Sequence, residues 1–393
     1  MRKFILLTIV SFFTIIANAQ WIEPSPVALN SQNVYSLISD GTNIFAGTGS
    51  AGVSLSTNNG NSWTAVNNGL TSTGISTFAI DGTNIFAASE GVFLSTNNGA
   101  QWTEVSDGLT NTTVNALIIN GTNVFAGTNG GVFLSTNNGT VWTAANNGFD
   151  SQVRALAVNG TNIFLGASNN GVYLSTNNGG LWTSVANGLT NTDVHSLVVS
   201  GTNIFAGTTG GVFISNNNGT LWTAVNNGLT NLYVNSLLVD GSTIFAGTED
   251  GVFYSYDMGA NWTAFNDGFP SNTNVYALTT DGTYIFAGMH LDPYGVWRRA
   301  LADLPVGIAD NNNNSFNLYP NPASDIIIIV KNSNINNADL TVNIYNVTGE
   351  LISTKKVQQN QQQIDIGDII NGIYMVEIKT KEWTEIQKLI IKR

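Results

Sequence analysis

The chain has 393 residues and a formal net charge of −12, with 41 glycines and no cysteine. Without cysteine it can form neither a disulfide nor a lipid-modified N-terminal cysteine, so an exported fold must rely on its core. Residues 20–301 contain three arginines, no lysine and 15 acidic residues. Their net charge of 3 − 15 = −12 argues against nucleic acid or anionic lipid as a partner.

The first 19 residues have the pattern of a secretory signal peptide. Arg2 and Lys3 form a basic start, an apolar run covers 4–16, and a small-residue cleavage site covers 17–19. The apolar run is too short to form a stable membrane-spanning helix, and no later stretch is long enough. We therefore expect a signal peptide over 1–19 and no transmembrane segment in the mature protein.

Residues 20–303 are organised around a repeated eight-residue stretch, seen in the form Ser-Thr-Asn-Asn-Gly-Thr-Val-Trp at 135–142. Each repeat holds four short runs rich in valine, isoleucine, phenylalanine and threonine, separated by Asp-Gly or Asn-Gly turns. A period of 39 or 40 residues with four strands predicts the blades of an all-β propeller. The repeated tryptophans are Trp63, Trp102, Trp142, Trp182, Trp222 and Trp262.

The number of first strands predicts seven blades. Residues 21–26 resemble an isolated fourth strand, whereas the last repeat lacks a tryptophan strand. We expect the N-terminal strand to complete the last blade, which closes the ring and removes two exposed sheet edges. The first strands begin at Val34, Ile75, Val114, Val153, Val194, Val234 and Val275.

The repeated stretch resembles the Asp box, or bacterial neuraminidase repeat, of sialidases and related propellers. The family pattern is Ser-x-Asp-x-Gly-x-Thr-Trp, and only the copy at 255–262 keeps the aspartate, Asp257. Asparagine keeps an oxygen that can accept hydrogen bonds from turn amides and tolerates left-handed backbone, so we interpret the box as a structural staple with a buried tryptophan. It lacks the charge that calcium prefers, and we predict no metal and no cofactor. The five asparagines are Asn58, Asn97, Asn137, Asn177 and Asn217.

After residue 303 the composition changes. We expect a polar linker over 304–314 and a small β-sandwich over 315–393, where isoleucine-rich runs predict strands. The segments at 318–323, 345–349 and 371–374 and the basic C-terminus resemble the C-terminal sorting domain of the type IX (Por) secretion system of Bacteroidetes. The resemblance implies that the secretion machinery is a partner of this domain, and that the protein passes through the periplasm to the outer surface or the medium.

One position varies among the otherwise similar first strands. It directly follows the first valine or isoleucine, and its neighbours stay apolar or small. Positions that are constant among blades serve the blade, whereas a variable one can serve a ligand, and we expect this ring near one mouth of the central channel. The alternative is a solvated channel mouth without a ligand. The seven residues are Tyr35, Ser76, Asn115, Arg154, His195, Asn235 and Tyr276.

The second candidate region is the loop between the second and third strands of the last blade. This loop contains His290 and Asp292 and is the longest of its kind. It is either a binding loop or an accommodation of the N-terminal strand. Asp292 with Glu249 or Asp250 would supply the two carboxylates of a polysaccharide-cleaving glycoside hydrolase.

The sequence predicts a secreted or cell-surface propeller that binds a glycan or protein without catalysis. The blades are nearly identical, whereas an active site usually requires one blade to depart strongly from the others. Sialidase chemistry needs three convergent arginines, but Arg298 and Arg299 are neighbours that point to opposite faces of a strand. A glycoside hydrolase and a structural surface component are the alternatives.

Overall fold

A computed structural model describes residues 20–22, 29, 32–291, 294–304, 316–319, 323–331, 340–346, 349–357, 361–379 and 384–391. The chain divides into two compact units, 1–304 and 305–393. The predicted signal peptide, most of the predicted linker and Asp292 lie outside the described residues.

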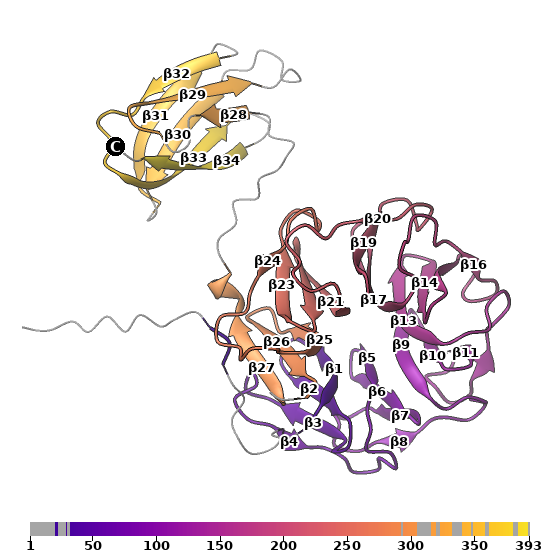
Figure 1. Cartoon of the computed structure of the whole chain (residues 1–393). Coiled ribbons are helices and arrows are strands. Elements are labelled where there is room, and N and C mark those ends of the chain that lie inside the picture. The colour runs from indigo at the N-terminus through magenta and orange to yellow at the C-terminus, as the bar shows by residue number, and fades with distance from the viewer. Residues whose placement is uncertain are drawn as a thin grey trace, which may run out of the picture. The chain divides into compact units, whose positions relative to one another are not determined.

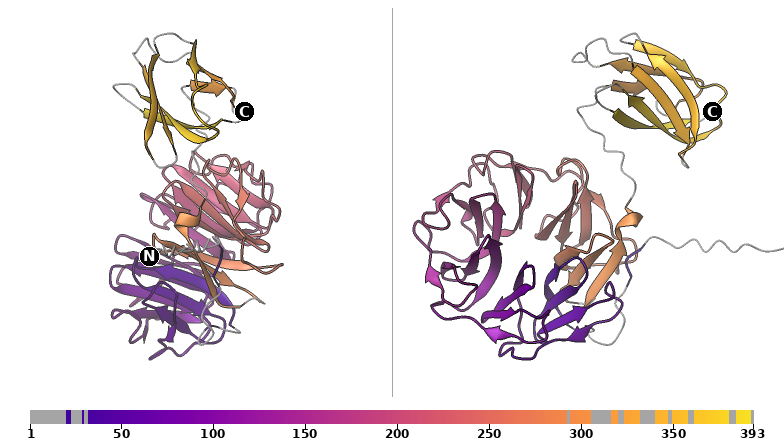
Figure 2. Two further views of the ribbon diagram at one scale, coloured as in Figure 1. Left: turned by 90° about the vertical axis from the view of Figure 1, so that its left-hand side faces the viewer. Right: turned by 180° about the vertical axis from the view of Figure 1, so that it is seen from behind.

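The first unit is a ring of seven antiparallel sheets whose first strands surround the centre (Figure 1). In the described residues, six sheets have four strands in chain order and the last has three. Figure 2 shows the same ring from behind. A short 3-10 helix, η1 (Leu301–Asp303), ends the unit.

The strand bounds follow the repeat. In blades 1 to 4 they are β1 Val34–Ser39, β2 Ile44–Thr48, β3 Val53–Ser56, β4 Thr64–Ala65, β5 Thr77–Asp81, β6 Asn84–Ser89, β7 Gly91–Ser95, β8 Thr103–Glu104, β9 Val114–Asn120, β10 Asn123–Thr128, β11 Gly131–Ser135, β12 Thr143–Ala144, β13 Val153–Asn159, β14 Asn162–Ala167, β15 Gly171–Ser175 and β16 Thr183–Ser184. In blades 5 to 7 they are β17 Val194–Ser200, β18 Asn203–Thr208, β19 Gly211–Ser215, β20 Thr223–Ala224, β21 Val234–Asp240, β22 Thr243–Thr248, β23 Gly251–Ser255, β24 Thr263–Ala264, β25 Val275–Thr280, β26 Tyr284–Met289 and β27 Val296–Ala300.

The second strand of each blade is almost wholly buried, because neighbouring blades cover both of its faces. In six of the seven blades a glycine near its end allows close approach of the next blade, and blade 2 has Ala88 at this place. A Cβ on Gly127 would lie 2.4 Å from a Val153 methyl carbon, and one on Gly288 would lie 2.7 Å from a Val34 methyl carbon. The last blade therefore packs on the first as the others pack on their neighbours.

The N-terminal residues complete the last blade. Ile22 pairs antiparallel with Arg298 of β27, and the Trp21 amide donates to the Asp267 carbonyl at 2.8 Å. The Trp21 indole donates to the Phe265 carbonyl at 2.5 Å. Equivalent indole bonds of 2.7 Å join the box tryptophans of blades 2 to 6 to the preceding blade. The predicted seven-bladed propeller with N-terminal closure is confirmed.

The box turns share one hydrogen-bond pattern. In the copy at 135–142, the Ser135 hydroxyl accepts from the Gly139 amide at 2.9 Å, and the Asn137 side-chain oxygen accepts from the Val141 amide at 3.0 Å. The left-handed backbone of each turn falls on the residue after the box asparagine or aspartate. Asparagine occupies this next position in five copies, as at Asn138 (φ 55°), but the sixth has Met258 (φ 58°).

The second unit contains two sheets, as predicted for a small β-sandwich. One has the order β28 (Phe316–Tyr319), β29 (Ile326–Lys331), β32 (Gln361–Asp365), and the other β31 (Leu351–Val357), β30 (Leu340–Asn346), β33 (Gly372–Lys379), β34 (Thr384–Ile391). Buried residues of both sheets, including Ile327, Ile329, Val342 and Val376, form one core. In the described part of the chain, no helix is long and apolar enough to cross a membrane.

Candidate functional site

The variable residue of the first strand is the extra residue of a β-bulge in six of the seven blades. In blade 4, Val153 pairs with Ala167 and Ala155 with Gly166, which leaves Arg154 without a partner across the sheet. A bulge interrupts the regular alternation of side chains and can re-aim one of them. The bulged residues are Tyr35, Asn115, Arg154, His195, Asn235 and Tyr276, and Ser76 directly precedes β5.

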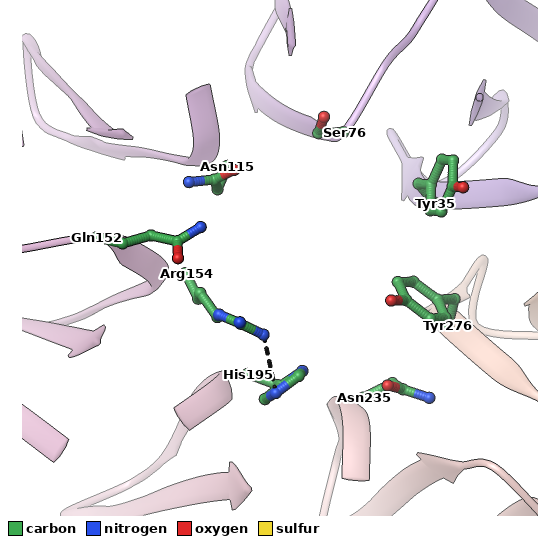
Figure 3. Close-up of a pocket in the computed structure, with 8 residues that line it drawn as sticks. All are labelled: Tyr35, Ser76, Asn115, Gln152, Arg154, His195, Asn235 and Tyr276. Carbon is green, nitrogen blue, oxygen red and sulfur yellow. Dashed lines mark hydrogen bonds between the residues drawn. The ribbon is translucent and has the colours of Figure 1, made fainter. Parts of the chain in front are cut away.

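These seven residues line one pocket at the centre of the ring (Figure 3). The pocket has a volume of about 350 Å³, and its eighth lining residue is Gln152. Sequence reasoning missed Gln152, although the position just before the first valine also varies from blade to blade. That second position supplies Asp193, Tyr233 and Asn274, all of which contact a bulged residue.

One wall of the pocket carries its charges. Arg154 Nη1 lies 3.0 Å from His195 Nε2, and Asp193 Oδ2 lies 3.2 Å from the same nitrogen. Arg154 Nε is 3.8 Å from Asp193 Oδ1 and has no hydrogen-bond partner among the described residues. The Arg154 side chain remains 32% exposed, so the guanidinium is only partly neutralised and stays accessible from the pocket.

His195 has two neighbours that favour opposite protonation states. Arg154 can donate to Nε2 only when that nitrogen carries no proton, whereas Asp193 can accept only when it does. Burial of the ring lowers the pKa of His195, the hydrogen bond to Asp193 opposes this, and the Arg154 charge lowers it further. The neutral imidazole satisfies Arg154 when its proton is on Nδ1 and Asp193 when its proton is on Nε2, and Nδ1 has no hydrogen bond to any described residue.

The opposite wall is aromatic. Tyr35 and Tyr276 meet edge to face with ring centroids 5.5 Å apart, and His290 lies 4.8 Å from Tyr276 and 5.5 Å from Tyr35. Figure 3 shows the two tyrosines across the pocket from Arg154, with the Tyr276 hydroxyl directed inward. Burial raises the pKa of Tyr276, and the neighbouring tyrosines Tyr233 and Tyr35 raise it further, so its hydroxyl stays protonated at neutral pH.

The amide residues of the ring are partly engaged in holding blades together. Asn115 Nδ2 donates to the Val153 carbonyl at 3.0 Å, and Asn235 Nδ2 donates to the Val275 carbonyl at 3.1 Å, each on the next blade. Asn235 Oδ1 is buried and has no partner among the described residues. Asn115 and Asn235 therefore have a structural role beside any role toward a ligand, and Asn235 retains a free acceptor.

The structure brings His290 of the candidate loop to the aromatic wall. Burial lowers the pKa of His290, and its Nδ1 is buried without a partner in the described residues. Asp292 lies outside those residues, so its pairing with Glu249 or Asp250 is not described. In the described part of the chain, no group of three histidine, cysteine or acidic residues could hold a metal ion.

Comparison with protein families matches two separate parts of the chain. The model of the secretion system C-terminal sorting domain matches residues 317–392, and that of the DUF6242 beta propeller domain matches residues 148–298. The chain is a β-propeller protein with a C-terminal sorting domain of the type IX secretion system. This domain directs the protein to the cell surface or outside and implies interaction with the secretion machinery. A search among curated protein sequences found no match.

Solved structures share the fold at low sequence identity. PorZ of Porphyromonas gingivalis, an essential surface component of the type IX secretion system, aligns with a TM-score of 0.55 and 16% identity over 92% of this chain and 59% of PorZ. YCF48 bound to D1 peptide aligns with a TM-score of 0.56 and 13% identity over 72% of this chain and 99% of YCF48. The GH74 enzyme of Niastella koreensis aligns with a TM-score of 0.53 and 19% identity over 69% of this chain and 43% of the enzyme. The chain thus spans about three fifths of the length of PorZ.

Proposed function

We propose that this secreted propeller binds a ligand in its central pocket without cleaving it, and that the ligand is a glycan. The bulges carry this proposal. They direct a variable side chain to one pocket from nearly every blade, while most of the blade is repeated with little change. A volume of about 350 Å³ lies in the range of sites for small molecules or single groups of a larger ligand.

The chemistry of the pocket suits a sugar. Tyrosine rings provide apolar surfaces with a polar edge, and amide, hydroxyl and charged groups provide hydrogen bonds in several directions. Structures with the same fold include a GH74 enzyme and a propeller bound to a peptide. Both glycan and protein ligands are therefore compatible with the fold, and the small aromatic and polar pocket favours the glycan. In this proposal the turns that resemble the Asp box stabilise the blades and do not bind the ligand.

The test uses the full chain without residues 1–19. Retention by immobilised neutral and acidic polysaccharides is measured together with the formation of new reducing ends. We expect retention without new reducing ends, and loss of retention in Tyr276→Ala. Tyr173→Ala is the matched control, because Tyr173 of β15 packs on Phe149 and does not line the pocket.

Other outcomes would contradict the proposal. New reducing ends that disappear in Asp292→Asn would establish the two-carboxylate hydrolase. Equal retention of the wild type and Tyr276→Ala would move the binding site away from the pocket. If no polysaccharide is retained while a peptide library is, the ligand is a protein.

A further inference from the structure

We infer that the charged wall of the pocket recognises an acidic group of the ligand, namely the carboxylate of an acidic sugar, with Arg154 and His195 as its hydrogen-bond donors. This inference rests on the proposed glycan binding and specifies its chemical class. A sugar carboxylate is planar and accepts two parallel hydrogen bonds, which matches the fork of a guanidinium.

Arg154 has donors to spare. Among the described residues, its one hydrogen bond is that of Nη1 with His195, and Asp193 approaches Nε no closer than 3.8 Å. Arg154 is the extra residue of its bulge, so it lines the pocket from β13 without a pairing partner on β14. Figure 3 shows its guanidinium between Gln152 and His195, facing the aromatic wall.

His195 adds a second donor beside the first. In the tautomer in which Nε2 accepts from Arg154, the proton of the neutral ring lies on Nδ1, which no described residue engages, and it is this tautomer that we infer to bind the ligand. Asp193 does not line the pocket, and its Oδ1 accepts from the Ser168 hydroxyl at 3.3 Å. The donor pair thus faces the pocket while the nearest carboxylate is partly engaged elsewhere.

The other walls fit the rest of a sugar. Ser76 and Gln152 line the pocket and can exchange hydrogen bonds with sugar hydroxyls. The Asn235 side chain is fixed in place, because Asn274 Oδ1 at 3.0 Å and the Val275 carbonyl accept from its amide, while its Oδ1 is buried. Tyr35 and Tyr276 supply apolar contact across the pocket. A ligand with hydroxyls, an apolar ring face and one carboxylate would meet all three features.

The charge of the blades makes Arg154 decisive. Residues 20–301 carry three arginines against 15 acidic residues, and only Arg154 lines the pocket. A general attraction for polyanions is absent from such a surface, and Asp193 and Glu249 near the pocket repel an anion. Binding of an acidic sugar must then depend on local hydrogen bonds to Arg154, so that one substitution should weaken it strongly.

The experiment compares oligogalacturonate with its methyl ester, which has the same sugar ring without the charge, by calorimetric titration of the full chain without residues 1–19. We expect the acid to bind at least about tenfold more tightly than the ester, and Arg154→Gln to weaken acid binding roughly 10- to 100-fold with little change for the ester. Arg154→Lys should restore only part of the affinity, because lysine lacks the planar fork. Lys355→Gln, at an exposed site of the sorting domain, makes the same charge change and should have no effect.

Each other outcome overturns the inference in a distinct way. Equal binding of acid and ester, with loss in Tyr276→Ala, would refute acid recognition and leave glycan binding intact. Binding of a sulfated galactan but not of oligogalacturonate would refute the claim that the recognised acidic group is a carboxylate. Absence of binding to every glycan would refute the proposed function itself. A thermal unfolding midpoint of Arg154→Gln equal to that of the wild type excludes loss of fold as the cause.

Discussion

Two features recur around the ring, and their sequences differ in opposite ways. The box turn is repeated six times with nearly the same residues and hydrogen bonds, and its tryptophan is buried in every copy. The bulge of the first strand has the same backbone form in six blades but carries tyrosine, asparagine, arginine or histidine. The comparison indicates that the turn contributes to stability, whereas the bulge distinguishes one blade from another. Four predictions test this division, ordered by the size of the effect.

Trp142→Ala should have the largest effect. It removes a buried ring (3% exposed) and the bond from Nε1 to the Val105 carbonyl, and loss of a buried tryptophan costs about 3–5 kcal/mol. Urea unfolding should show this decrease, while Arg154→Gln should change stability by less than about 1 kcal/mol. Trp142→Phe, which keeps most of the packing, should fall between them. A smaller loss in Trp142→Ala than in Arg154→Gln would reverse the comparison.

Gly127→Ala should destabilise the contact between blades 3 and 4. The added Cβ would lie 2.4 Å from a Val153 methyl carbon, and overpacking of this kind costs about 1–3 kcal/mol. Blade 2 offers an internal control, since Ala88 already occupies the equivalent place. Ala88→Gly should leave a small void there. Measured unfolding free energies that do not differ from the wild type at Gly127→Ala would show that the blades can separate without cost.

The pH dependence of ligand binding should arise from His195, the bulged residue of blade 5. Burial lowers the pKa of His195 in the free protein, and an anion beside the ring would raise it, so binding takes up a proton. Affinity for the acidic oligosaccharide should increase as the pH falls through the raised pKa, by up to about tenfold per pH unit, and level off below the lowered one. Titrations between about pH 5 and 8 should show this slope in the wild type and none in His195→Gln. A slope that persists in His195→Gln would assign the proton to another group, with His290, Asp193 and Glu249 as neighbours to test.

Met258→Asn should have the smallest effect and should stabilise the protein. Met258 has a left-handed backbone (φ 58°) at a position where the five other boxes have asparagine. A residue with a long side chain pays roughly 1 kcal/mol for this conformation, which asparagine largely avoids. The thermal midpoint should rise slightly, and ligand affinity should not change. A decrease would mean that the Met258 side chain contributes more by packing than it loses in the backbone.

The sequence predicted the blades because their periodicity is strong and their turns have a specific chemistry. It predicted ring closure because Trp21 supplies the tryptophan that the last repeat lacks. The structure agrees, because Ile22 pairs with Arg298 of the last blade and Trp21 donates to the Asp267 and Phe265 carbonyls. It selected the ring residues because repeats allow an internal comparison. Their role in binding remains a prediction.

Other parts of the site depend on contacts between blades that no single repeat contains. The bulge arises from the register of β-strands, and neither the opposing demands on His195 nor the engagement of Asn115 with Val153 is visible before the blades are placed side by side. Gln152 was missed although the variable position before the first valine carried a signal for it.

Closure of the ring by the N-terminal residues has a consequence for how the protein folds. The indole of Trp21 and the carbonyl that it reaches are 244 residues apart in the chain, so the first part of the propeller to be synthesised must wait for the last before the ring can close. Every blade can form from local hairpins, but this one docking step carries the entropy of a very long loop. Until it occurs, the flanks of the first and last blades are exposed to proteases and to other chains.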